Sequence, residues 1–192
     1  MRVSSYTRTR KKVWLHLGIG VFLTFLLLPL ISQASTTSIA KGDPLPNARV
    51  IQADGNPIEL NSFKGRVKIL SMVPQLNTPV CDEQTHRFSE KNEGLDQLLE
   101  IFTISTNSAQ DQAQFAEKAN IHNITFLSDS PDFDFGKKTG LLLPNHGILH
   151  RAVFVADSDN VIRYIEIVPM SQLPNFERAY EAARNVLNST QP

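Results

Sequence analysis

Apolar and polar positions follow two different patterns along the chain. The stretch 13–31 contains no Asp, Glu, Lys or Arg, whereas from position 42 onward the apolar residues come in short runs separated by polar turns. Short runs of this kind are typical of the strands and amphipathic helices of a folded domain. The pattern therefore predicts an apolar leader followed by a single domain.

Several of the short apolar runs are bounded by turn residues and predict β-strands. The sequence Asp54-Gly55-Asn56-Pro57 is a turn signal, and the runs on either side of it predict an N-terminal β-hairpin. Residues 157–160 predict a second hairpin near the C-terminus in the same way. The expected strands cover 49–52, 58–60, 67–73, 100–105, 124–127, 152–156 and 161–168.

Other segments have the length and spacing of helices. One begins near Val80, directly after Pro79, and another covers 108–119, where alanines recur at helical spacing. A third covers 176–187 with its apolar residues on one stripe, and a short additional helix is allowed for between 127 and 152. This alternation predicts an α/β domain, in which a mixed sheet is flanked by helices on both faces.

The leader has the layout of a secretory signal peptide. A basic stretch at 1–12 precedes the apolar run, and Ser32 and Ala34 provide the small residues of a cleavage site. An uncleaved anchor is the alternative, because the run is long enough to cross a hydrocarbon core of about 30 Å. Either way the domain lies outside the cytoplasm, and we expect it in the periplasm.

These boundaries divide the chain into four parts. We expect a signal peptide at 1–34, a polar tether at 35–41, the folded domain at 42–188 and a short tail at 189–192.

Charge is distributed unevenly, although the formal net charge is zero. The leader holds five basic residues and no acidic one, which leaves 14 basic against 19 acidic residues in the rest of the chain. A mildly acidic domain is a poor partner for nucleic acid, and it would meet a membrane only through an uncleaved leader. The chain has one cysteine, Cys81, so a disulfide within the chain is excluded.

The chemistry of the domain is expected around Cys81, in the first turn of the helix that begins near Val80. The free backbone N–H groups and positive dipole end at such a position favour a thiolate, the reactive form of cysteine. Thr78 lies in the preceding loop, where its hydroxyl can donate to a thiolate or to a bound oxygen, and Pro74 stiffens the start of that loop. A free cysteine is also commonly a small buried apolar residue, and position alone leaves both interpretations open.

Residues 74–81 spell P-x-x-x-T-x-x-C, which resembles the peroxidatic-cysteine signature of the peroxiredoxins. The chain is most similar to the thiol peroxidase branch, from about 42 to 187, with further matches at 42–46 and 151–155. The resemblance implies a thioredoxin-like fold and a peroxidase that needs neither a metal nor an organic cofactor. It also implies the catalytic residues, which are Cys81 as the attacking thiolate together with Thr78, Pro74 and Arg151.

Two positions depart from the pattern of that branch. Asn77 stands where the loop usually has an aspartate, and Ala116 stands where the resolving cysteine is expected. The chain therefore resembles a one-cysteine version of the branch. In such a version a peroxide oxidises Cys81 to a sulfenic acid, and an external thiol or dithiol reduces it again.

Two other classes of function share some of these features. A peroxide sensor or a non-enzymatic binding module on the same fold would contain the same cysteine, and repeated turnover with a thiol would distinguish the enzyme from both. A thiol-disulfide oxidoreductase is disfavoured, because the chain has no C-x-x-C motif. The sequence leaves open the reductant, the preferred peroxide and the formation of a homodimer.

Overall fold

A computed structural model of the chain describes residues 39–189. The predicted signal peptide, the first residues of the predicted tether and the last three residues lie outside this range. The strands are β1 Arg49–Gln52, β2 Pro57–Glu59, β3 Lys68–Met72, β4 Glu100–Ser105, β5 Thr125–Ser128, β6 Leu142–Leu143, β7 Ile148–Leu149, β8 Ala152–Ala156 and β9 Ile162–Ile167. The helices are α1 Pro79–Glu90, α2 Ala109–Ala119, α3 Asp134–Thr139 and α4 Phe176–Ser189, with 3-10 helices η1 Leu60–Phe63 and η2 Leu95–Gln97.

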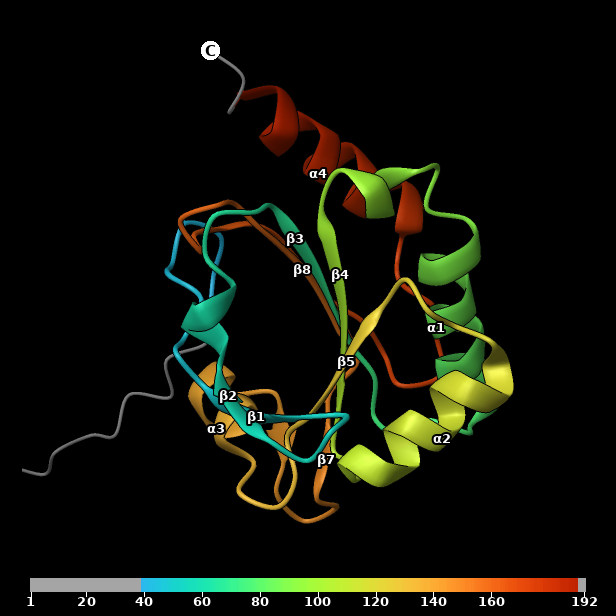
Figure 1. Cartoon of the computed structure of the whole chain (residues 1–192). Helices are drawn as coiled ribbons and strands as arrows, with labels where there is room; N and C mark the ends of the chain where they lie inside the picture. Colours follow the sequence, from blue (N-terminus) through green and yellow to red (C-terminus); the bar gives the residue numbers. More distant parts are fainter. Residues whose placement is uncertain (1–38, 190–192) are drawn as a thin grey trace, which may run out of the picture. The chain divides into compact units, whose positions relative to one another are not determined.

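A seven-stranded mixed sheet forms the centre of the domain, in the order β2-β1-β5-β4-β3-β8-β9 (Figure 1). The inner strands β3, β4 and β5 are parallel, and the remaining strands extend the sheet on both sides in antiparallel pairs. This confirms the predicted mixed α/β sheet with an N-terminal hairpin. Because β8 runs antiparallel to β3, the start of β8 lies beside the end of β3, where Ala152 pairs with Met72.

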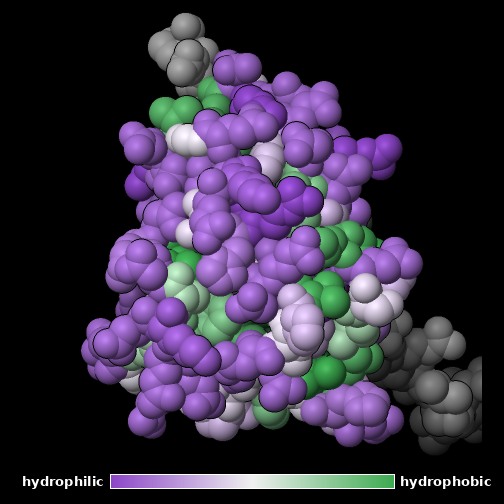
Figure 2. All heavy atoms as spheres, turned by 90° about the vertical axis from the view of Figure 1, so that its right-hand side faces the viewer, coloured by the Kyte–Doolittle hydropathy of each residue, from purple (hydrophilic) through white to green (hydrophobic). Residues whose placement is uncertain are grey.

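Each face of the sheet has its own apolar core and its own covering helices. On one face α1, α2 and α4 contribute Phe88, Phe115 and Tyr180 to the core, and on the other η1 and α3 contribute Leu60 and Phe135. The outer side of α1 and α2 is mostly hydrophilic, with apolar patches in the lower half of the view (Figure 2). This is the surface expected of amphipathic helices. Within residues 39–189, no helix has the length and apolar character that a membrane crossing requires.

The observed elements differ from the expected ones mainly at their ends. The β6–β7 pair was not predicted, and α3 occupies the place of the short additional helix. At the N-terminal boundary, Ile39 packs against the core on the α3 side, and the Gly42 N–H donates to the Ile162 carbonyl at 2.8 Å. At the other end α4 continues to Ser189. Ile39 and Ser189 thus lie just outside 42–188, the bounds expected for the folded domain.

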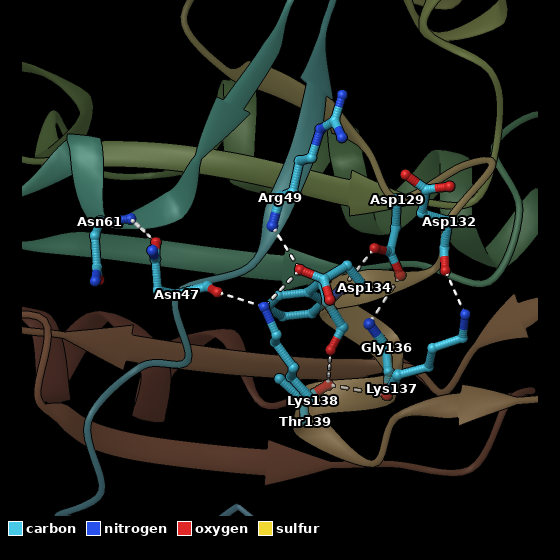
Figure 3. Close-up of polar contacts among 11 residues, drawn as sticks. Asn47, Arg49, Asn61, Asp129, Asp132, Asp134, Gly136, Lys137, Lys138 and Thr139 are labelled. Carbon is cyan, nitrogen blue, oxygen red and sulfur yellow. Dashed lines mark hydrogen bonds and ion pairs between the residues drawn. The ribbon is translucent and has the colours of Figure 1, made fainter.

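Polar contacts attach α3 to the loop and strand that begin the domain (Figure 3). Asp134 Oδ2 accepts hydrogen bonds from the Arg49 N–H at 2.8 Å and from Lys138 Nζ at 2.7 Å, and Lys138 also donates to the Asn47 carbonyl. Partial burial tends to raise the pKa of Asp134, but the bonds from Lys138 and Arg49 outweigh it and hold the pKa below its ordinary value. Close by, Asn47 Oδ1 accepts from the Asn61 N–H at 3.0 Å.

Candidate active site

Cys81 is the third residue of α1 and follows the loop that leaves the end of β3. Pro79 occupies the first position of the helix, where its missing N–H removes no hydrogen bond, and Thr78 precedes it in an extended conformation. The Cys81 side chain is only 1% exposed and belongs to the core beneath α1. The sulfur therefore lies within the first helical turn, shielded from bulk water.

Arg151 lies beside this sulfur, although 70 residues separate the two along the chain. It directly precedes β8, and the pairing of β8 with β3 brings it to the sheet edge from which the Cys81 loop departs. Its Nη2 is 3.2 Å from Cys81 Sγ, and the side chain is buried. The contact places a permanent positive charge directly beside the sulfur, inside the buried part of the site.

The other donors of Arg151 are also engaged, which fixes the direction of the guanidinium. Nη1 donates to Gln84 Oε1 at 2.6 Å, while Nε and Nη2 donate to the Met170 carbonyl at 3.2 Å and 3.0 Å. These contacts come from α1 and from the loop after β9. Two elements therefore hold the guanidinium against the sulfur.

Gln84 is a residue of this site that the sequence analysis did not identify. It lies three positions after Cys81 on α1, hence on the same side of the helix, and it is fully buried. Its Nε2 donates to Ser71 Oγ at 2.8 Å, so its oxygen faces Arg151. A polar side chain one helical turn from the cysteine, on the apolar face, is the signal that could have revealed it.

The loop from Pro74 to Thr78 supplies the remaining predicted residues. Pro74 is buried at its start, and the Thr78 hydroxyl donates to the Gln75 carbonyl at 3.0 Å. The expected donation to the sulfur or to a bound oxygen is therefore not the bond that the structure shows, because the hydroxyl proton is given to Gln75. The lone pairs of the hydroxyl oxygen are available to accept a hydrogen bond. Asn77 has a φ of 64°, in the left-handed region that both Asn and Asp tolerate. Asparagine at this position is therefore compatible with the same backbone turn.

Of the four predicted residues, the structure brings Cys81 and Arg151 into direct contact, while Pro74 and Thr78 lie in the loop that joins β3 to α1. Ala116, by contrast, lies on α2, half-buried against the core to which Cys81 belongs. In the described part of the chain, no group of three or more His, Cys, Asp or Glu side chains is arranged to hold a metal ion. A sulfur nucleophile, a fixed positive charge and a hydroxyl are the groups that thiolate attack on a polar bond requires.

The chain is similar in sequence and in structure to several known proteins. The Redoxin family profile matches residues 40–182. A thiol peroxidase of Staphylococcus haemolyticus is 34% identical over 151 residues, covering 78% of this chain and 91% of that protein. A thiol peroxidase of Halalkalibacterium halodurans is 36% identical over 147 residues, covering 76% and 88%. The crystal structure of a peroxiredoxin-like protein from Aquifex aeolicus superposes with a TM-score of 0.71 at 29% identity, covering 78% and 88%.

Proposed function

Since the chain belongs to the Redoxin family, as a thiol peroxidase of the peroxiredoxin superfamily, we propose that Cys81 reduces hydrogen peroxide or alkyl hydroperoxides by a one-cysteine mechanism. The observation that carries this proposal is the 3.2 Å contact between Cys81 Sγ and Arg151 Nη2 inside a buried helix start. The contact gives the nucleophilic sulfur a fixed positive charge that can also face the oxygens of a bound peroxide.

In the oxidative step, the Cys81 thiolate attacks the terminal oxygen of the peroxide. A sulfur–oxygen bond forms while the O–O bond breaks, so the sulfur becomes a sulfenic acid and the leaving oxygen departs as hydroxide or alkoxide, which water protonates. Arg151 stabilises the thiolate before the attack and the negative charge that develops on the oxygens during it. The Thr78 oxygen can accept the hydrogen bond of the peroxide hydroxyl and so orient it.

In the reductive step, an external thiol or dithiol restores Cys81. The first thiol condenses with the sulfenic acid, which releases water and forms a mixed disulfide, and a second thiol displaces Cys81 from it. Cys81 is the only cysteine of the sequence, so the second sulfur has to come from another molecule. A reductase with two thiols or two equivalents of a small thiol meets this need.

Residues 1–34 support a proposal about where this reaction takes place. The basic stretch and the apolar run that follows it favour export of the domain to the periplasm, with cleavage after Ala34 or with the leader retained as an anchor. The mass of the protein isolated from the cell envelope tests the proposal. A mass lacking residues 1–34 indicates cleavage, and recovery of the protein from the cytoplasm would contradict export.

Cys81→Ser is expected to abolish peroxide consumption in the presence of a thiol, because the hydroxyl is similar in size to the thiol but far less ionised. The measurement is peroxide loss over time with dithiothreitol as the donor, with circular dichroism to show that the variant is folded. Activity retained in Cys81→Ser would contradict the assignment. Wild-type protein that stopped after about one peroxide per chain, despite the thiol, would instead indicate a sensor.

A further inference from the structure

We propose that Asn107 is a positioning residue of the peroxidatic reaction, because it holds the loop that carries Thr78. This inference rests on the proposed role of Thr78 at Cys81. Asn107 lies in the segment between β4 and α2, and β4 is the neighbour of β3 on the side away from β8 and Arg151.

A hydrogen bond joins the Pro74–Thr78 loop to the segment that carries Asn107. The Leu76 N–H, in the middle of the Pro74–Thr78 loop, donates to Asn107 Oδ1 at 2.9 Å, across 31 residues of sequence. The Leu76 side chain is 1% exposed and belongs to the same core as Cys81. The loop is thus fixed at its centre, through its backbone by Asn107 and through its side chain by the core.

Asn107 is itself held by a cluster of buried polar residues. Its Oδ1 also accepts from Ser105 Oγ at 3.2 Å, and its carbonyl accepts from Ser128 Oγ at 2.6 Å. Gln112 Nε2 donates to Ser105 Oγ at 2.9 Å and to the Leu127 carbonyl at 3.0 Å, which ties α2 and β5 to the same cluster. Because the Leu76 N–H can only donate, the Asn107 amide cannot rotate by half a turn without placing its own NH₂ group against that N–H.

The consequence for the reaction follows from the position of Thr78. It comes two residues after Leu76, and Asn77 between them is in the left-handed region, so a shift of the Leu76 backbone turns directly into a shift of Thr78. A displacement of about 1 Å at a reacting group can cost a factor of about 100 in rate. Asn107 therefore sets the place from which the Thr78 hydroxyl meets the peroxide, without itself touching the substrate.

A double-mutant cycle on the full-length protein tests this inference. The second-order rate of Cys81 oxidation by hydrogen peroxide is measured by rapid quench and mass spectrometry in four proteins: wild type, Asn107→Ala, Thr78→Val and the double variant. We expect Asn107→Ala to slow oxidation about tenfold when Thr78 is present. In the Thr78→Val background the same change should cost less than about twofold, because the group that Asn107 positions is already gone.

Two further variants separate positioning from stability. Asn107→Asp keeps an oxygen that can accept from the Leu76 N–H, so the loop should stay in place. The added negative charge should then change the oxidation rate by the same factor with Thr78 and with Thr78→Val, to within about twofold. Asn47→Ala removes a similar bond between an amide oxygen and a distant backbone N–H, to Asn61 at 3.0 Å, in a loop on the α3 side. We expect this matched control to leave the oxidation rate unchanged.

The outcomes that overturn the inference are distinct. If Asn107→Ala has no effect, or has an equal effect in both backgrounds, Asn107 does not act through Thr78. If Thr78→Val alone leaves the rate unchanged, the proposed role of Thr78 fails and the inference fails with it. The peroxidase assignment would still stand in that case, since it depends on the result for Cys81→Ser.

Discussion

Arg151 is the residue on which both the charge and the geometry of the active site depend. One guanidinium nitrogen contacts the Cys81 sulfur, another contacts Gln84, and the Met170 carbonyl accepts from two of them. Replacing Arg151 alone is expected to lower the free energy of unfolding, because the buried groups that it contacts would lose their hydrogen bonds. The positive charge of Arg151 is therefore fixed in place by the same contacts that pack the site.

Arg151→Met is expected to slow oxidation of Cys81 by peroxide about 10²–10³-fold, the usual cost of losing one preorganised donor to the transition state. Methionine has a similar length but neither charge nor donors. Arg163→Met is the matched control, because Arg163 pairs with Asp157 at 2.7 Å on the turn before β9 and leaves Cys81 untouched. A rate for Arg151→Met within about twofold of wild type would show that the arginine does not assist the reaction.

The residues of this site differ in how far their roles could be predicted from the sequence. Cys81 drew attention by itself, as a lone cysteine at a helix start, whereas Arg151 entered through the resemblance to a family. Asn107 was not identified, because an isolated asparagine looks like a surface residue until the structure shows its hydrogen bonds. Gln84 was not identified either, although its place one helical turn after Cys81 was a usable signal. The roles of these two amide side chains depend on hydrogen-bond partners that lie far away along the chain. Spacing in the sequence does not reveal those partners.

At the scale of elements, α3 depends on one buried carboxylate. Asp129 follows β5, is 2% exposed, and accepts hydrogen bonds from the Phe135 and Gly136 N–H groups, each at 2.8 Å (Figure 3). Burial raises the pKa of Asp129 to about 6, although the bonds from Gly136 and Phe135 act in the opposite direction. The first turn of α3 thus rests on a group that titrates in mildly acidic solution.

The stability of the wild-type protein relative to Asp129→Asn is expected to fall as the pH rises from about 4 to about 6. An acid whose pKa is higher in the folded state binds its proton more tightly there, so its contribution to stability is lost as that proton leaves. The pKa shift from 3.8 to about 6 corresponds to a change of about 3 kcal/mol. Urea denaturation of both proteins at several pH values measures it, and a difference that is constant from pH 4 to 7 would contradict the raised pKa.

The elements themselves were largely predictable, and the exceptions have a common cause. Strands such as β3 and β8 are fully buried and read as continuous apolar runs, which local sequence reveals. The β6–β7 pair has strands of only two residues, each partly determined by packing against α3 and the core. Strands of two residues are too short to show an alternation of apolar and polar positions, so tertiary contacts decide their conformation.

At the scale of the whole molecule, the single cysteine limits what the protein can do alone. Given excess peroxide and no thiol, it should consume a burst of about one peroxide per chain and then stop, because the sulfenic acid has no second thiol in the chain to condense with. A sulfenic-acid reagent such as dimedone should label Cys81 after the burst, and added dithiothreitol should restore turnover. Cys81→Ser is the control and should show no burst.

Sustained consumption without any thiol would contradict this prediction. A covalent dimer on a non-reducing gel would then identify a Cys81–Cys81 disulfide between chains as the reason. The low exposure of the sulfur disfavours that route, because both sites would have to open at once.

Burial of Cys81 also makes the two halves of the catalytic cycle respond differently to the flexibility of the protein. A peroxide is small, but the thiol of a reductase belongs to a large molecule and can meet the sulfur only when the first turn of α1 opens. The free energy of that local opening then limits how fast the protein is regenerated. Conditions that suppress opening, such as added osmolytes, should therefore slow regeneration while sparing oxidation. The oxidised form accumulates under such conditions, and with it the risk of irreversible conversion to the sulfinic acid.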